Sequence, residues 1–263
     1  VTAKNAGEKD KVVVEIISYP TENYLARGVI IEVLGKAGRY DTEIKAVIRQ
    51  YHIPEEFSEQ CYEQARLAAE QFSSQRLDRR EDITNKVTIT IDPPDAKDFD
   101  DAISIERDNK GNWVLGVHIA DVSFFIPPDS PLDKEAKVRG NSVYLPGKTI
   151  PMLPEILSNG ICSLQPDQKR LVKSAYLTYD HEGNVISRRF ANSVMCSAQR
   201  LTYLQADAAL RRHTKGIKPE VVELLQNAEK LSRVIEQRRE NNGMLHLDLP
   251  EIEVIFDKSG RVV

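Results

Sequence analysis

Apolar and polar residues alternate in several short stretches of the chain, and this alternation predicts β-strands. In Val87–Ile91 a branched apolar residue occupies every second position, so the two threonines between them and the following Asp92 face the other way. We therefore expect Asp92 on the polar side of a half-buried strand. Further strands are predicted over residues 11–17, 28–34, 102–106, 113–119, 173–179, 185–192, 245–249 and 252–256.

Apolar residues at helical spacing predict two long helices. Pro54–Ser73 has apolar or small residues at positions 57, 61, 65, 68 and 72, and its proline stands where a helix can begin. Pro219–Arg239 carries a similar apolar stripe. The shorter and more charged Leu132–Arg139 is also expected to be helical. We expect the first long helix to link two domains.

This mixture of elements indicates an α+β fold. Residues 1–50 predict a partial small β-barrel, of which residues 43–48 form a third apolar stretch. The segment is too short for a complete five-stranded barrel, so we expect the chain to begin inside a domain. Residues 51–86 are expected to form the linker helix and a basic loop at 76–82. Residues 87–263 then form a mixed domain of sheet and helices.

Composition narrows the class of protein without identifying it. The chain has 263 residues, 41% of them hydrophobic, and a net charge of −4. It has no apolar run long enough to span a membrane and no signal peptide at its start, so we expect no membrane association. Cys61, Cys162 and Cys196 are scattered, which argues against disulfides and a zinc knuckle and favours a cytoplasmic location.

A cluster of aspartates follows the predicted strand at 87–91. Residues 91–102 read Ile-Asp-Pro-Pro-Asp-Ala-Lys-Asp-Phe-Asp-Asp-Ala, and another apolar strand follows them. We therefore expect an acidic loop between two strands, called the aspartate loop below. Asp95 is expected to be solvated or to lie outside the ligand set. The other four aspartates have the spacing D-x5-D-x-D-D: Asp92, Asp98, Asp100 and Asp101.

Carboxylates gathered in this way require a cation or a proton. Two carboxylates about 4 Å apart repel by about 4 kcal/mol at an effective dielectric constant near 20. Oxygen ligands without a nearby Cys or His favour Mg²⁺ or Mn²⁺ over zinc. A calcium EF-hand does not fit, because the third and fifth positions counted from Asp92 are Pro94 and Ala96. Multi-carboxylate Mg²⁺ sites most often act on phosphates, and the competing interpretation is a solvated acidic turn.

The aspartate loop resembles the active-site loop of the RNase II/RNase R family of exoribonucleases, within the RNB catalytic domain. The loop match is Thr90–Ala102. The first 50 residues resemble the end of the cold-shock (OB-type) domain that precedes the catalytic domain in this family. On this basis, residues 87–263 are the N-terminal part of the RNB catalytic domain. Four other segments resemble the family in the same order: Gly116–Ser123, Ser142–Gly147, Ile150–Leu164 and Ala198–Tyr203.

The resemblance implies a processive hydrolase that acts on single-stranded RNA from the 3′ end and releases nucleoside 5′-monophosphates in RNA decay and processing. Asp92, Asp98 and Asp101 would hold one or two Mg²⁺ ions, for which Mn²⁺ can substitute. Asp100 would act on the attacking water or on a second ion. The resemblance also leads us to expect a monomer.

Two tyrosines in polar, loop-like settings gain a role from the resemblance. Tyr144 matches the aromatic residue that packs against the base at the RNA 3′ end, and Tyr203 matches the tyrosine that helps to set product length. Stacking of a base on an aromatic ring contributes about 1–3 kcal/mol and tolerates any sequence. Without the resemblance, each tyrosine is interpreted as a packing residue. His118 is likewise interpreted as a structural histidine rather than a catalytic base.

Two further interpretations stay open. In the family, the catalytic domain continues past the position matching Val263 and carries an arginine near the scissile phosphate, so we expect this chain to be a fragment that binds metal but hydrolyses poorly. An RNA-binding or regulatory module without turnover is therefore an alternative. A metal-stabilised structural domain unrelated to RNA is a third.

Overall fold

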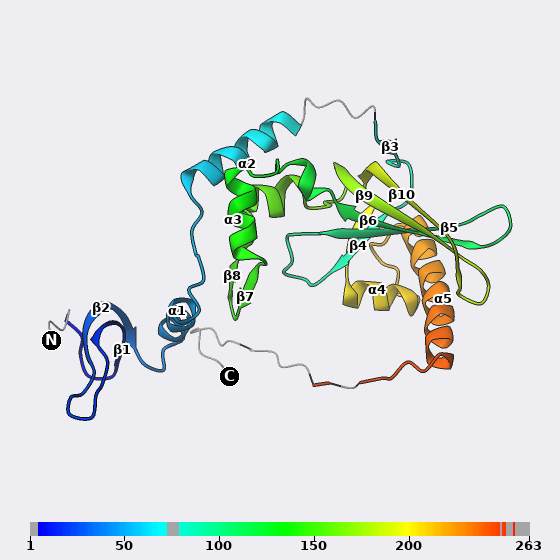
Figure 1. Ribbon diagram of the computed structural model, residues 1–263. Helices are drawn as coiled ribbons and strands as arrows, with labels where there is room; N and C mark the ends of the chain where they lie inside the picture. The colour runs from blue at the N-terminus through cyan, green and yellow to red at the C-terminus, as the bar shows by residue number, and fades with distance from the viewer. Residues whose placement is uncertain (1–4, 73–78, 248, 251–254, 256–263) are drawn as a thin grey trace. The chain divides into compact units, whose positions relative to one another are not determined.

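The computed structural model describes residues 5–72, 79–247, 249–250 and 255, and the chain divides into two compact units (Figure 1). Unit 1 comprises the described residues of Val1–Phe57, Arg139–Met152 and Leu249–Val263. Unit 2 comprises those of Ser58–Val138 and Leu153–Asp248. A segment from the middle of the chain, Arg139–Met152, therefore belongs with the N-terminal residues.

Unit 1 contains two antiparallel strand pairs and a helix. β1 (Asp10–Ser18) pairs with β2 (Arg27–Lys36), and β7 (Val143–Leu145) pairs with β8 (Lys148–Ile150). Helix α1 (Tyr40–Gln50) follows β2.

Residues 43–48, expected as an apolar stretch of the barrel, lie within α1 instead. Ile44, Val47 and Ile48 recur at intervals of three and four residues, which gathers them on one helical face. Ile48 is buried at 1% exposure, so this face is the packed one.

A seven-stranded sheet organises unit 2. Its outermost strand pairs, β11–β4 and β10–β3, are parallel, and the pairs between them are antiparallel. The strands expected at 102–106, 113–119, 173–179 and 185–192 are confirmed as β5, β6, β9 and β10. The spatial order is β11 (Gln199–Thr202), β4 (Ile89–Asp92), β5 (Asp101–Arg107), β6 (Trp113–Ala120), β9 (Lys169–Tyr179), β10 (Val185–Cys196) and β3 (Glu81–Asp82).

The helices of unit 2 follow most of the predicted spans. The charged helix is α3 (Pro131–Arg139), and the C-terminal one is α5 (Pro219–Asn241), with its proline in the first turn. The expected linker helix is shorter, since α2 (Glu59–Phe72) begins after Pro54–Phe57. A further helix, α4 (Tyr203–Leu210), and two short turns, Val122–Phe124 (3-10) and Ile156–Ile161 (π), complete the set in the described part of unit 2.

The main core lies between α4, α5 and the strands β4 and β11. Its buried residues come from all four elements: Ile89, Leu201, Ala206, Ala209, Val221, Leu224 and Leu225. Strand β4 is covered on both faces, because Thr88 and Thr90 are buried as completely as Ile89. The expectation of a half-buried strand is therefore wrong. β4 pairs with β11 and β5 along its two edges, and the buried Thr88 hydroxyl donates to Cys196 O (3.1 Å).

The end of the chain departs from prediction. Among the described residues of 245–249, no strand forms, although a strand was expected there. The strand expected at 252–256 lies outside the described residues except for Ile255, and residues 76–78 of the basic loop also lie outside them. Within the described parts, no helix is long and apolar enough to cross a membrane.

A buried ion pair connects the segment before β3 to the end of β6. Arg80 Nη2 donates to Asp121 Oδ2 at 2.6 Å, and Lys173 Nζ lies 3.3 Å from Asp121 Oδ1. Asp121 is 3% exposed. Burial opposes ionisation of this carboxyl, but the hydrogen bonds from Arg80 and Ser123 outweigh it and lower the pKa of Asp121. Asp121 thus stays charged inside the unit.

We expect Arg80→Met to lower the free energy of unfolding of unit 2 by about 3 kcal/mol, because it leaves a buried carboxylate with one partner fewer. The fluorescence of Trp113, the one tryptophan of the chain and buried in unit 2, reports urea unfolding of this unit. Lys137→Met, which removes the exposed pair with Asp133, should change it by less than about 0.5 kcal/mol. Equal effects of the two substitutions would contradict this assignment.

Candidate functional site

The aspartate loop connects two adjacent antiparallel strands of the sheet. Asp92 is the last residue of β4, and Asp101 is the first residue of β5. Asp98 and Asp100 lie in the loop between them, with Asp98 half-buried and Asp100 exposed. Asp95 is exposed, as are Asp100 and Asp101, so its place outside the ligand set stays a prediction. The expectation of an acidic loop between two strands is confirmed.

Backbone hydrogen bonds fix the second half of the loop. Ser163 Oγ accepts from Phe99 N (3.1 Å) and donates to Lys97 O (2.7 Å), and Leu164 N donates to Phe99 O (2.9 Å). Ser163 is fully buried, so these bonds are shielded from water. Ala120 N, at the end of β6, donates to Asp100 O (2.9 Å). The loop is thus anchored by Ser163 and Leu164, which end one of the segments that resemble the family.

A buried arginine supports that segment in turn. Arg170 is 7% exposed, and its Nε donates to Ser163 O at 2.7 Å. Its other nitrogens donate to Lys169 O (3.1 Å) and to Gly160 O (3.4 Å). Burial lowers the pKa of this guanidinium. Arg170 therefore connects the β9 strand to the turn that anchors the aspartate loop.

The carboxylates of the loop disfavour one another's ionisation. Burial raises the pKa of Asp92, the Thr90 hydroxyl opposes this, and the charges of Asp101 and Asp98 raise it further. Asp100 is exposed, but the partial burial of its carboxyl group raises its pKa. The charges of Asp98, Asp101 and Asp92 add to that effect. The loop therefore concentrates negative charge that a cation would offset.

One oxygen of this cluster lacks a partner. Asp92 Oδ2 is buried and has no hydrogen bond to any residue in the part of the chain that the structure describes. A buried carboxylate oxygen left in this state is costly, and a cation would satisfy it. This oxygen is the point of the loop at which a ligand is most clearly required.

Arg200 brings a positive charge to the loop from the edge strand β11. Its guanidinium donates to Pro93 O and lies 5.3 Å from the centre of the Phe99 ring. Its charge lowers the pKa of Asp92. Arg200 Nε is buried without a hydrogen-bond partner among the described residues. Our sequence interpretation missed this residue and Ser163, although both lie inside segments that carry the family resemblance.

The two predicted tyrosines lie in different units. Tyr203 begins α4 directly after Thr202, which pairs with Asp92 across β11 and β4. It is 61% exposed, so its ring is accessible next to the strand that carries Asp92. Tyr144 lies on β7 in unit 1 and is 69% exposed. Both rings are thus exposed on the surface, and neither is the packing residue that was expected without the family resemblance.

His118 is a structural histidine, as expected. It is fully buried, and its ring nitrogens lie 2.9 Å from Ser104 Oγ and 2.8 Å from Ser174 Oγ. Burial lowers its pKa to about 4, so the ring is neutral at physiological pH. Both nitrogens are occupied within the sheet, which leaves His118 no free atom for proton transfer at the aspartate loop.

The aspartate donors fit a hard cation that is bound partly through water. In the described regions, one trio of His, Cys, Asp or Glu side chains brings ligand atoms within 4.8 Å of one another, and it is Glu236, Glu240 and His246 rather than the loop. The loop carboxylates are therefore spaced too widely for three of them to contact one ion directly. Mg²⁺ retains several waters and needs only one or two direct carboxylates, so this spacing and the unpartnered Asp92 oxygen suit it.

Comparison with protein families identifies both parts of the chain. The RNB domain matches residues 80–263, and a cold shock domain matches residues 2–58. The chain belongs to the RNB family. The expected α+β fold, with an OB-type start, is confirmed for this RNB chain. The predicted domain limits at residues 50 and 86 stay predictions.

Known RNB proteins resemble the chain over nearly its whole length. Ribonuclease R of Aquifex aeolicus is 37% identical over 96% of this chain and 36% of its own length. Ribonuclease R of Thermotoga maritima is 38% identical over 98% of this chain and 37% of its own. The structure of Mycoplasma genitalium RNase R with ribose methylated single-stranded RNA superposes with a TM-score of 0.90 at 30% identity, covering 99% of this chain and 40% of that one. The chain thus spans little more than a third of the curated relatives.

We expect Asp100→Asn to stabilise unit 2 in the absence of divalent cations, by less than about 1 kcal/mol because Asp100 is solvent-exposed. Its raised pKa means that the ionised form is disfavoured by the fold, so the stability deficit is present at neutral pH and disappears as pH falls through the folded pKa. Mg²⁺ at 100 times its Kd should raise the stability of the unsubstituted chain by about 2.7 kcal/mol, and that of the variant by less.

Urea unfolding monitored by Trp113 fluorescence, with chelator or with Mg²⁺, measures both effects. Asp95→Asn is the matched control, since it removes one charge from an exposed position of the same loop. The cation site would be refuted by an Mg²⁺ response that is equal in all three proteins.

Proposed function

We propose that this RNB chain carries the metal-binding aspartates of an exoribonuclease active site, which hydrolyses single-stranded RNA from its 3′ end and releases nucleoside 5′-monophosphates. The observation that carries the proposal is the aspartate loop, where carboxylates raise one another's pKa around a buried oxygen without a described partner. RNA as the substrate is supported by the relatives named Ribonuclease R and by the RNase R complex with single-stranded RNA.

In this proposal the four aspartates have two different roles. Asp92, Asp98 and Asp101 hold one or two Mg²⁺ ions, or Mn²⁺ in their place, directly or through water. When bound, the cation supplies Lewis-acid stabilisation of charge on the phosphate. Asp100 accepts a proton from the attacking water, a role that its raised pKa favours over that of an ordinary aspartate.

The bond changes follow from hydrolysis of a phosphodiester. The water oxygen attacks the last phosphorus of the RNA, and the bond from that phosphorus to the 3′ oxygen of the preceding nucleotide breaks. The shortened RNA retains a 3′ hydroxyl, which takes a proton from solvent, and the released nucleotide retains its 5′ phosphate. Arg200, whose charge already acts on Asp92, is available to offset charge on the phosphate.

The two exposed tyrosines hold the RNA in this proposal. Tyr144 stacks on the base at the 3′ end, and Tyr203, adjacent to the strand of Asp92, limits how short a product can remain bound. The reaction is processive in this proposal, because the same RNA strand advances into the site after each nucleotide is released. We further propose a monomer in the cytoplasm, for which the expectation from sequence is the basis.

The exposed tyrosines support a second candidate. Tyr144 and Tyr203 could hold RNA without a metal ion, so the chain is also a candidate RNA-binding module without turnover. Such a module binds RNA and releases no mononucleotide. The two candidates therefore differ in product formation and not in affinity.

A 5′-labelled single-stranded RNA, incubated with Mg²⁺ or with chelator, separates them. We expect a ladder that shortens from the 3′ end, is abolished by chelator and falls at least about 100-fold in Asp100→Asn, as for loss of a general base. Asp95→Asn should leave the rate within about twofold of the unsubstituted chain. Bound RNA without a ladder, in this chain and in one extended beyond Val263, would exclude the enzyme and leave the binding module.

Tyr144→Ala should weaken the affinity for single-stranded RNA by about 10- to 100-fold, because a stacked base contributes about 1–3 kcal/mol. Tyr144→Phe keeps the ring and should remain within about threefold. Fluorescence anisotropy with a labelled oligonucleotide measures both in chelator, where hydrolysis does not interfere. An alanine variant that binds like the phenylalanine variant would remove Tyr144 from the proposed RNA contact.

A further inference from the structure

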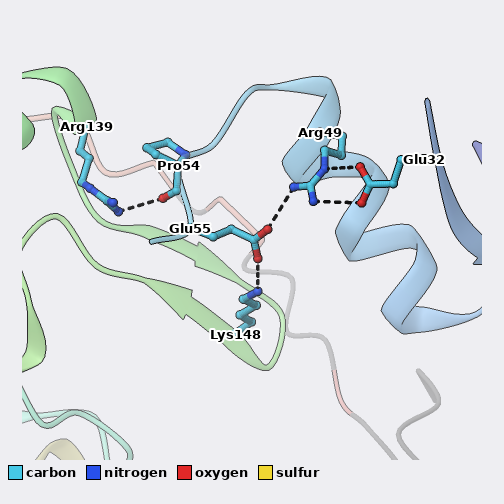
Figure 2. Close-up of polar contacts among 6 residues, drawn as sticks. All are labelled: Glu32, Arg49, Pro54, Glu55, Arg139 and Lys148. Atoms are coloured by element: carbon cyan, nitrogen blue, oxygen red, sulfur yellow. Dashed lines mark hydrogen bonds and ion pairs between the residues drawn. The ribbon is translucent and has the colours of Figure 1, made fainter. Parts of the chain in front are cut away.

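A chain of four alternating charges runs through unit 1 (Figure 2). Arg49 of α1 donates two hydrogen bonds to Glu32 of β2, at 2.7 and 3.0 Å. Its third nitrogen donates to Glu55 at 3.1 Å, and the other oxygen of Glu55 accepts from Lys148 of β8 at 2.5 Å. Glu55 is therefore shared between the N-terminal elements and the β7–β8 hairpin.

Arg139 makes a second connection between the same two parts. Its guanidinium donates to Pro54 O (2.8 Å) and Glu56 O (2.7 Å), on both sides of Glu55, as Figure 2 shows for Pro54. It also donates to Pro151 O (3.2 Å) and lies 3.7 Å from the ring centre of Phe57. The two ends of the hairpin segment are thus tied to residues 54–57.

These contacts cross a boundary in the sequence. Residues 2–58 match the cold shock domain, whereas the β7–β8 hairpin lies within the part that matches the RNB domain. In space the hairpin belongs to the same compact unit as the cold-shock residues. The hairpin also carries Tyr144, which pairs with Thr149, next to Lys148. A side chain proposed to hold RNA is therefore attached to the cold-shock part of the protein.

We propose that Glu55 is a positioning residue for RNA binding: by accepting from both Arg49 and Lys148, it fixes the hairpin that presents Tyr144 to the 3′-terminal base. This inference rests on the proposed function. It adds that a carboxylate of the cold-shock part, beside the contacts of Arg139, contributes to where the end of the RNA strand is held.

The physical properties of Glu55 suit this task. The hydrogen bond from Lys148 lowers its pKa, burial opposes the change, and the bond from Arg49 lowers it further, so Glu55 stays ionised. Its side chain is 31% exposed, against 41% for Arg49 and 44% for Lys148. One exposed ion pair contributes little to stability. Glu55, however, accepts from two cationic side chains at once, and Arg49 also donates two parallel hydrogen bonds to Glu32. Loss of Glu55 therefore breaks the chain of charges at its centre.

The first measurement is hydrogen exchange of the β7–β8 amides, followed by mass spectrometry on the whole chain. Glu55→Gln and Lys148→Gln should each speed exchange over residues 143–150 by about two- to fivefold, since each loses an interaction of the size of an exposed ion pair. The double variant should exchange no faster than either single one, because both remove the same contact. At about 1 M salt, where the Debye length is about 3 Å, the differences should vanish.

The second measurement is the hydrolysis of single-stranded RNA. In Glu55→Gln, KM should rise about two- to fivefold with kcat within twofold, because the substituted residue positions the substrate and does not touch the reacting atoms. Glu55→Asp keeps the charge and should recover at least half of the loss. Glu106→Gln is the matched control, since Glu106 pairs with Lys86 at the same 2.5 Å distance within unit 2, whereas the hairpin belongs to unit 1.

Each outcome decides the inference. Unchanged exchange over residues 143–150 in both single variants would overturn it, as would faster exchange with an unchanged KM. If neither the unsubstituted chain nor one extended beyond Val263 hydrolyses RNA, the proposed function fails by itself, and the Kd for single-stranded RNA replaces KM. A two- to fivefold weaker Kd in Glu55→Gln then supports the positioning role, and an unchanged Kd overturns it.

Discussion

Ionised carboxylates on one short loop repel one another, and the fold of unit 2 must hold them together before any cation arrives. It does so through the backbone rather than through the charged groups themselves. Asp92 and Asp101 are the ends of paired strands, while Ser163 and Leu164 bind the peptide groups around Phe99 from behind. These anchors bind backbone atoms of the loop, and Asp92 Oδ2 is a buried carboxylate oxygen without a hydrogen-bond partner among the described residues.

Arginine and lysine side chains form ion pairs of two kinds in this protein. Arg80 forms a buried ion pair with Asp121. Removing Arg80 would leave the charged Asp121 carboxylate in the protein interior, which solvates it poorly, so the pair stabilises unit 2. The ion pairs of unit 1 are partly exposed, and each is individually weak and sensitive to salt. Such contacts add little to stability but can select one arrangement of a hairpin, which is the role proposed for Glu55.

Sequence order and spatial grouping disagree in the middle of the chain. The hairpin that carries Tyr144 lies within the RNB match but packs with residues that match the cold shock domain, whereas Tyr203 belongs to unit 2 beside the aspartate strand. The two aromatic residues proposed to hold the RNA thus belong to separate units. The contacts within unit 1 therefore bear on Tyr144 alone, and those of unit 2 bear on Tyr203 and the aspartate loop.

The sequence by itself determined the α+β class, the strands flanking the aspartate loop, and the helices predicted at 132–139 and 219–239, because these depend on local periodicity and spacing. Its choice of carboxylates stays a prediction. It misjudged residues 43–48, where helical and strand patterns are both satisfied over a short span, and the environment of Thr88 and Thr90. Only the tertiary structure decided that β11 pairs with β4, which brings Arg200 to the aspartate loop, that Thr88 and Thr90 are buried, and that Arg139–Met152 joins the N-terminal unit. These outcomes depend on contacts between residues far apart in the chain, and a local sequence pattern does not specify such contacts.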